Sequence, residues 1–428
     1  MKTLKRLAMF KNASLWMLVS GLTIWAGNAK ALNSGTIYVC NFDDDTVSVI
    51  SLNTLAVVKT IPVGDGPGFV IVTPDGTKAY VANRGGNGSG NSNTVSVIST
   101  STDTVIATIP VERQPYQIAV SRDSRRVYVA NRLSSTISII DTATDMVLTN
   151  VPTGRPFPIT LAFHPVRDEV WVGYNSGMAG GGAIEARSAT DLSLIASTAS
   201  TFIYFASADL AFLPDGSEAY GAEGCGFCGR FNRISGVPSG ATINIIGAPI
   251  YENNQGAALA VAANPKSDRV YFAKLGQNGG PHLVREFNRN AVPQLGRTVT
   301  FSGSPADLAV TPDGKFLFVV NQVLPVGFIS VIDTSNFTTV ATVNVGNYPG
   351  GIAIKPNPPT VLTIAVADVQ VCWNSLSNTL YQVEYKSVLT TNTWTSLGVP
   401  VAGNGSTNCF VDSVLNDPQR IYRVSVVE

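Results

Sequence analysis

The chain of 428 residues has only two histidines, and one of them is a candidate general base. His164 precedes a proline in a short turn, so we expect it to be structural. His282, in the segment GGPHLVREF, is expected on an exposed turn, where an imidazole could accept a proton. No Ser or Cys accompanies His282 in this segment, so the sequence does not predict a nucleophilic triad.

Two aspartates complete the set of candidate catalytic residues. Asp209 and Asp307 each begin a short apolar segment, at a position where the equivalent segments carry Phe, Gln, Thr, Ala or Gly. A carboxylate at such a position could act as a general base or bind a cation. The alternative is structural, with each carboxylate accepting hydrogen bonds from backbone amides of neighbouring strands.

Four arginines form a separate candidate binding site. Arg84 and Arg132 each follow the asparagine of a Val-Ala-Asn motif, and Arg113 and Arg155 occupy the segments VERQPY and TGRPFP. A guanidinium group can bind carboxylate, sulfate or phosphate through two parallel hydrogen bonds. We expect the four side chains to converge, which predicts a site for an anionic ligand such as an acidic sugar. The alternative is that each arginine pairs locally with a carboxylate or a backbone carbonyl group.

The segment GCGFCGR places Cys225 and Cys228 in a CxxC motif. Haem attachment would require a histidine at position 229, where the chain has glycine, and a zinc site would require two further ligands. A disulfide that clamps this loop is the favoured interpretation, and thiol redox activity is the alternative. We predict no bound metal and no cofactor.

Three more cysteines remain. Cys372 and Cys409 lie in the strand-like segments VQVCW and NCFVD, and we expect them to form a disulfide. In the chain-entropy description, a disulfide that closes a loop of this length stabilises the fold by roughly 3 to 4 kcal/mol. Cys40 is then unpaired and is expected to be a small buried apolar side chain.

Most of these residues belong to an internal repeat. A motif of an aromatic residue, Val, a variable residue and Asn recurs, complete or altered, roughly every 45 residues. Its aromatic positions are Tyr38, Tyr80, Tyr128, Trp171, Tyr220, Tyr271 and Phe318. Each unit contains three other short runs rich in Val, Ile and Thr, so we expect four strands per unit. This length and strand number indicate a seven-bladed β-propeller rather than a helical solenoid.

The order of the runs predicts how the ring closes. The chain enters the repeat at Thr36 on a second strand, and the seventh copy of the first strand, residues 351–354, comes last. We therefore expect residues 351–354 to pair with residues 37–41, so that one blade contains both ends of the domain. Such closure leaves few free strand edges, and we expect a monomer.

The repeats resemble those of the YVTN-type β-propeller family, whose units read close to YVAN…NTVSVIDT…VIATIPVG…PxGIAVTPDG. The resemblance covers about three quarters of the chain and is strongest in blades one to three and seven. It implies a seven-bladed fold similar to surface-layer-type and lactonase-like propellers. It implies architecture more strongly than chemistry.

Variation in turn length is confined to one face of the expected propeller. The turns between second and third strands differ in length, whereas the turns between first and second strands stay close to TPDG, as at residues 73–76 and 311–314. We call the face that carries the variable turns and the connections between blades the variable face. Variation on one face of a rigid scaffold is typical of a recognition surface, although Gly- and Asn-rich turns also suit a tolerant surface without a ligand.

The N-terminus is typical of an exported protein. Four basic residues, an apolar run at residues 15–26 and the motif Ala29-Lys30-Ala31 predict a signal peptide cut before Leu32. The alternative, a retained membrane anchor, is disfavoured because the apolar run is shorter than a membrane span requires. We expect a periplasmic, extracellular or cell-surface location. The zero formal net charge argues against nucleic-acid binding.

The sequence therefore predicts an all-β protein, with a signal peptide at 1–31, a seven-bladed propeller at 32–356 and a small β-sandwich at 357–428. The last segment resembles fibronectin type III modules through its alternating apolar runs and spaced aromatic residues. We expect a binding or cell-surface interaction protein that recognises an anionic small molecule, a glycan or a protein partner. The alternative is a propeller hydrolase that opens a lactone or ester with His282 or Asp307.

Overall fold

A computed structural model of the chain describes residues 35–86, 92–175, 182–198, 207–223, 230–247, 250–251, 256–276, 280–290, 295–356, 368–386, 393–413 and 421–427. The chain divides into two compact units, Met1–Pro358 and Pro359–Glu428. The predicted signal peptide at 1–31 lies outside the described residues.

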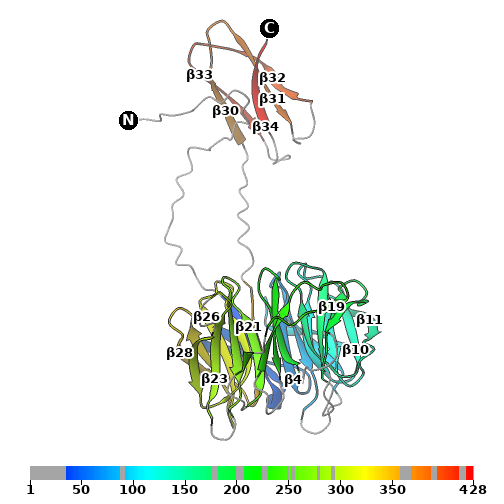
Figure 1. Ribbon diagram of the computed structural model, residues 1–428. Coiled ribbons are helices and arrows are strands. Elements are labelled where there is room, and N and C mark those ends of the chain that lie inside the picture. The colour runs from blue at the N-terminus through cyan, green and yellow to red at the C-terminus, as the bar shows by residue number, and fades with distance from the viewer. Residues whose placement is uncertain are drawn as a thin grey trace. The chain divides into compact units, whose positions relative to one another are not determined.

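Seven sheets form the first unit, which confirms the predicted all-β propeller (Figure 1). Each sheet is one blade, and its strands are given from the innermost outward. Blade one contains β29 (Pro349–Ile354), β1 (Thr36–Asn41), β2 (Thr46–Ser51) and β3 (Ala56–Pro62); blade two contains β4 (Pro67–Val72), β5 (Lys78–Asn83), β6 (Thr94–Ser99) and β7 (Thr104–Pro110); blade three contains β8 (Pro115–Val120), β9 (Arg126–Asn131), β10 (Thr136–Asp141) and β11 (Met146–Pro152); and blade four contains β12 (Pro158–Phe163), β13 (Glu169–Tyr174), β14 (Ile184–Ser188), β15 (Leu194–Thr198) and β19 (Thr242–Ile243). Blade five contains β16 (Ser207–Phe212), β17 (Glu218–Glu223), β18 (Arg230–Ser235) and β20 (Ile250–Tyr251); blade six contains β21 (Ala258–Ala263), β22 (Arg269–Lys274), β23 (His282–Asn288) and β24 (Leu295–Phe301); and blade seven contains β25 (Ser304–Val310), β26 (Phe316–Gln322), β27 (Phe328–Asp333) and β28 (Thr338–Asn344).

The two ends of the propeller meet in one sheet. Strand β29 pairs antiparallel with β1, with Ile37 opposite Ile354, Tyr38 opposite Ala353 and Val39 opposite Ile352. This pairing confirms the predicted closure. The innermost strand of each sheet contacts those of its two neighbours, so seven strands surround a central channel.

The repeated aromatic residues hold neighbouring blades together. Tyr38 and Tyr80 are fully buried, and each side chain packs in a core between adjacent sheets. The hydroxyl of Tyr38 donates to Asp103 (2.6 Å), and that of Tyr80 donates to Asp145 (2.7 Å), across the blade boundary. The motif thus places one aromatic ring and one hydrogen bond at each of these junctions.

The repeated asparagine joins the second strand to the third. The Asn83 side-chain amide donates to the hydroxyls of Thr94 (3.0 Å) and Ser96 (3.0 Å) on β6. Asn41 and Asn131 make the same pair of bonds in their own blades. These contacts explain why Asn in the second strand accompanies Thr-x-Ser in the third.

Replacement of Asn83 by alanine is expected to destabilise the propeller by about 1 to 3 kcal/mol, because the buried hydroxyl of Ser96 and the half-buried hydroxyl of Thr94 lose their donor. Denaturant unfolding of the Asn83→Ala variant measures this loss. The matched control is Asn53→Ala, since Asn53 is exposed. Equal stabilities of the two variants would contradict the cross-strand role of Asn83.

Blades four and five depart from the expected pattern. Strand β19 lies parallel to β15 and adds a fifth strand to the sheet of blade four. In blade five the described part of the outer strand, β20, covers Ile250–Tyr251. The segment after β18 therefore contributes to two neighbouring blades, which the altered repeats in this region did not predict.

The second unit contains two small sheets. Strand β30 (Asp368–Asn374) pairs with β33 (Thr407–Ser413), and β31 (Leu380–Lys386) lies between β32 (Thr395–Ala402) and β34 (Ile421–Val427). Cys372 and Cys409 face each other on β30 and β33 and form the expected disulfide. Cys40, in the propeller, is buried and unpaired.

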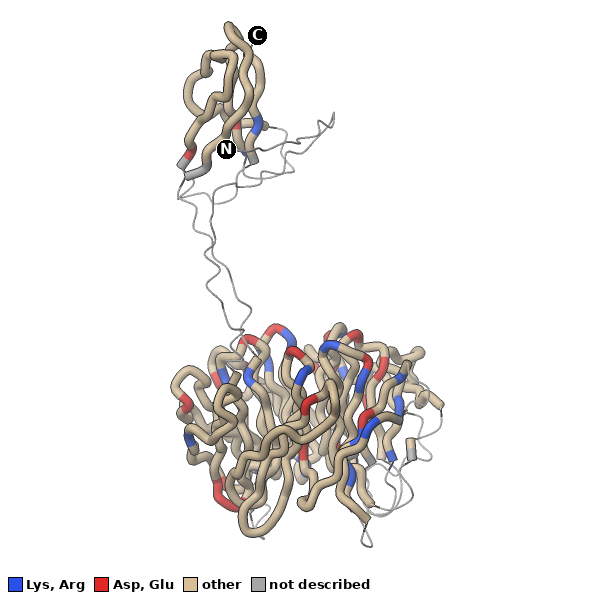
Figure 2. Tube along the Cα trace, turned by 90° about the vertical axis from the view of Figure 1, so that its left-hand side faces the viewer, with Lys and Arg blue, Asp and Glu red and all other residues tan. Residues whose placement is uncertain are grey.

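Charged residues of both signs intermingle on the propeller face formed by the turns between first and second strands (Figure 2). Within the part of the chain that the structure describes, no helix has the length and hydropathy needed to cross a bilayer.

Candidate functional site

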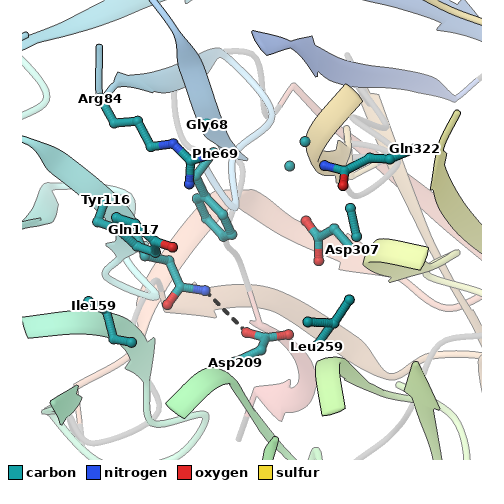
Figure 3. Close-up of a pocket in the computed structure, with 13 residues that line it drawn as sticks. Gly68, Phe69, Arg84, Tyr116, Gln117, Ile159, Asp209, Leu259, Asp307 and Gln322 are labelled. Carbon is teal, nitrogen blue, oxygen red and sulfur yellow. Dashed lines mark hydrogen bonds between the residues drawn. The ribbon is translucent and has the colours of Figure 1, made fainter. Parts of the chain in front are cut away.

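A cavity of about 220 Å³ opens where the innermost strands begin, at the variable face (Figure 3). It lies between blades rather than within one, because each sheet contributes residues from the start of its first strand. Its lining comprises Gly68, Phe69, Arg84, Tyr116, Gln117, Ile159, Asp209, Leu259, Ala306, Asp307, Gln322, Gly350 and Gly351. The two candidate aspartates and one of the four candidate arginines thus share a single cavity.

The floor of this cavity is built by side chains that link innermost strands. Asp209, on β16, accepts hydrogen bonds from the backbone amides of Leu210 (2.9 Å) and, on the next blade, Val261 (3.0 Å). Asp307, on β25, accepts from its own neighbour Leu308 (2.8 Å) and from Ile352 on β29 (2.9 Å). Each carboxylate therefore joins its blade to the following one.

Gln117 extends the same arrangement to a third pair of blades. Its side-chain oxygen accepts from the backbone amide of Leu161 on β12 (2.7 Å), and its amide group donates to Asp209 (3.1 Å). Figure 3 shows this bond, with Asp209 between Ile159 and Leu259 and with Asp307 on the opposite side from Arg84. These contacts are the strand-amide contacts named as the structural alternative for the two aspartates.

The carboxyl groups of Asp209 and Asp307 both have raised pKa values. Burial, together with the nearby charge of Asp209, raises the pKa of Asp307 to about 8. Burial also raises the pKa of Asp209, although its three hydrogen-bond donors act in the opposite direction. Among the described residues neither carboxylate forms an ion pair that would offset this burial, so we expect Asp307 to be protonated at neutral pH. The floor can then donate as well as accept hydrogen bonds.

A second cavity of about 390 Å³ continues the channel below this floor. Phe69, Gln117, Asp209 and Asp307 line both cavities, so they mark the boundary between them. The lower cavity is lined by many apolar side chains, including Ile71 and Phe163. Polar chemistry in the channel is therefore concentrated at the floor and in the upper cavity.

Arg84 forms the wall of the upper cavity. Its guanidinium carbon lies 4.6 Å from the centre of the Phe42 ring and 5.1 Å from that of Tyr116. The aliphatic part of the side chain crosses Gly68, where a Cβ would approach the Arg84 Cδ to 2.8 Å. No carboxylate among the described residues forms an ion pair with Arg84. The structure thus holds a cation between two aromatic rings at the mouth of the channel.

The other three candidate arginines do not line the cavity. Arg132 donates to the side chain of Gln114 (2.6 Å) and lies over the ring of Phe157 (5.4 Å). Arg155 forms an ion pair with the buried Glu185 (2.8 Å). Arg113 is exposed, and its backbone amide donates to Ser134 (3.0 Å).

Neither histidine lines the cavity. His282 begins the third strand of its blade and accepts a hydrogen bond from the backbone amide of Gly276 (3.1 Å). His164 is fully buried and contacts the carbonyl of Gly236 (2.9 Å), in keeping with the structural role expected for it. Cys225 and Cys228 lie outside the described residues. Nowhere in the described ranges do three His, Cys, Asp or Glu side chains cluster as a metal site would require.

Three lining residues were missed by sequence reasoning. Tyr116 and Gln117 are adjacent on β8, and Gln322 ends β26. Gln117 occupies the position of the repeat that Asp209 and Asp307 occupy in their own blades, and this equivalence could have identified it from the sequence. Tyr116 and Gln322 gave no such signal, because nothing in the repeat marks the position of either.

The fold and the cavity define a seven-bladed propeller with a polar site at the mouth of its channel. In sequence, residues 25–160 match the model of the lactonase family described as "Lactonase, 7-bladed beta-propeller". A comparison with curated protein sequences found no match.

Several solved structures share the fold. A functionally unknown protein from Desulfotomaculum acetoxidans has a TM-score of 0.61 and 17% identity, over 76% of this chain and 100% of that chain. A putative 6-phosphogluconolactonase from Bacteroides uniformis has a TM-score of 0.58 and 14% identity, over 75% and 99%. Kuenenia stuttgartiensis hydrazine synthase has a TM-score of 0.57 and 15% identity, over 68% and 90%. At these identities the likeness concerns the fold alone.

Proposed function

We propose that this protein is an exported binding module that recognises a compact anionic ligand at the mouth of the propeller channel. The observation that carries the proposal is Arg84, a cation held between the rings of Phe42 and Tyr116 with no ion-pair partner among the described residues. The two rings contact the guanidinium without neutralising its charge, so its N–H groups can still bind an anion. That geometry suits a carboxylate, sulfate or phosphate group.

The size and position of the cavity support a small ligand. Its volume of about 220 Å³ is below the roughly 300 to 1,000 Å³ of typical drug-sized sites. The floor adds hydrogen-bonding groups from Asp209, Asp307 and Gln117, which would orient a ligand held by Arg84.

Binding of D-galacturonate, measured by titration calorimetry, tests the proposal. We expect Arg84→Ala to weaken binding at least tenfold, since a charged hydrogen bond contributes about 1.5 to 3 kcal/mol. The control is Arg125→Ala, an arginine whose side chain is 84% exposed, on the opposite face, and it should bind as the parent does. Absence of binding by the parent, or equal binding by Arg84→Ala, would overturn the proposal.

Lactone hydrolysis is the second candidate, favoured by the lactonase-family match over residues 25–160 and by the protonated carboxyl of Asp307. Asp209 would assist attack of water on the lactone carbonyl, and Asp307 would protonate the departing ring oxygen. Turnover of δ-gluconolactone that is lost in Asp307→Asn would replace the binding proposal with this one.

We also propose the domain organisation expected from the sequence. Residues 1–31 are a signal peptide, residues 32–356 form a propeller of YVTN-type repeats, and residues 357–428 form a fibronectin type III-like module. The protein is exported and monomeric. The role proposed for the second unit is to attach the propeller to a partner or to present it at the cell surface.

A further inference from the structure

A row of aromatic rings leads from the cavity across the variable face. Tyr116 and Phe42 flank Arg84, and the ring of Phe42 lies 6.0 Å from that of Tyr348. Tyr348 precedes β29 and is 39% exposed. The row therefore begins beside the cavity and ends at an exposed ring on the rim.

The backbone at Tyr348 is in a conformation that favours glycine. Its φ is 48°, and it directly precedes Pro349. The equivalent positions before Pro67, Pro115 and Pro158 are Gly66, Gln114 and Phe157, with φ of 60°, 56° and 56°. Positive φ is therefore a feature of this position in the repeat, and glycine fits it without strain. What makes the Tyr348 side chain a candidate for recognition is its exposed ring beside Phe42.

The floor of the cavity narrows the chemical class of the ligand. Arg84 attracts an anion, whereas the floor, with Asp209, Asp307 and Gln117, offers hydrogen-bond donors and acceptors that suit neutral hydroxyl groups. A sugar acid combines one carboxylate with several hydroxyls on a ring that can stack on an aromatic face. An acidic peptide offers carboxylates without such hydroxyls, so it fits the floor less well.

We infer that the ligand is an acidic oligosaccharide, with its terminal sugar acid in the cavity and the next sugar ring against Tyr348. This inference rests on the proposed function and extends it from a compact anion to a chain of uronic acids. Arg84 binds the carboxylate of the terminal sugar, the floor binds its hydroxyls, and Tyr348 forms an outer subsite.

Calorimetry with mono-, di- and trigalacturonate tests the outer subsite. In the parent protein we expect the second sugar to improve affinity at least tenfold. Tyr348→Gly should remove that improvement and leave monogalacturonate binding unchanged, whereas Tyr348→Phe should retain it because the ring remains. Since glycine suits the positive φ, Tyr348→Gly should melt within a few degrees of the parent.

The outcomes separate this inference from the function on which it rests. Binding of monogalacturonate without any gain from the second sugar would overturn the outer subsite and leave the proposed function standing. No binding of monogalacturonate by the parent would overturn the proposed function itself. Tighter binding of tetraglutamate than of trigalacturonate would replace the oligosaccharide with an acidic peptide.

Discussion

Truncation of the chain after Val345 is expected to abolish folding of the propeller, whereas truncation after Pro358 is expected to leave it folded. The shorter chain ends after β28 and lacks β29, the innermost strand of the sheet that contains β1. The longer chain keeps β29 and the whole first unit. The two truncated chains therefore differ in a single strand.

The expected loss is large because β29 contributes packing and hydrogen bonds together. Ile352 is 5% exposed and packs in the core between the first and last blades, and burial of such a side chain contributes about 1.5 to 3 kcal/mol. Its backbone amide also donates to Asp307. Without β29, β1 would have a free edge, and the summed losses approach the roughly 5 to 15 kcal/mol by which a domain is stable.

Circular dichroism and limited proteolysis of the two truncated chains measure the outcome. We expect a cooperative thermal transition and resistance to protease only for the chain that ends at Pro358. A folded, protease-resistant protein ending at Val345 would show that closure by the two ends is dispensable for this propeller.

Closure could be predicted from the sequence because it depends on the order of the strand motifs. A chain that enters on a second strand at Thr36 and supplies its last first strand near Ile352 can complete the ring in one way. The extra strand β19 could not be predicted in this manner. It is two residues long and pairs with β15 through backbone groups, so it leaves no side-chain pattern in the sequence.

The candidate site was predictable only in part, for a similar reason. Asp209 and Asp307 stand out because they are the charged residues at a position where the other copies of the repeat carry Phe, Gln, Thr, Ala or Gly. The repeat also places Arg84 on the correct face, but it does not show that Tyr116 and Phe42 cover the guanidinium. Those contacts join three blades, and their geometry depends on how the blades pack around the ring.

The propeller is expected to lose stability as the pH rises from about 5 to 9, and Asp307→Asn is expected to reduce this loss. The pKa of Asp307 is about 8 in the folded protein and has the ordinary value of 3.8 in the unfolded chain. Between these values the folded state binds a proton that the unfolded state has released, so stability falls as pH rises through this window. Above about pH 8 the contribution is lost.

Denaturant unfolding at pH 5 and pH 9 measures the size of this effect. Each unit of pKa shift corresponds to about 1.4 kcal/mol, and the range from pH 5 to the folded pKa covers about three units, so we expect the parent to lose ~4 kcal/mol from this group. Asp307→Asn carries no titrating group at this position. The control, Asp43→Asn on an exposed turn, should reproduce the slope of the parent. If Asp307→Asn kept that slope as well, the two channel carboxyls would both be ionised at neutral pH, and the floor could not donate a hydrogen bond to a ligand.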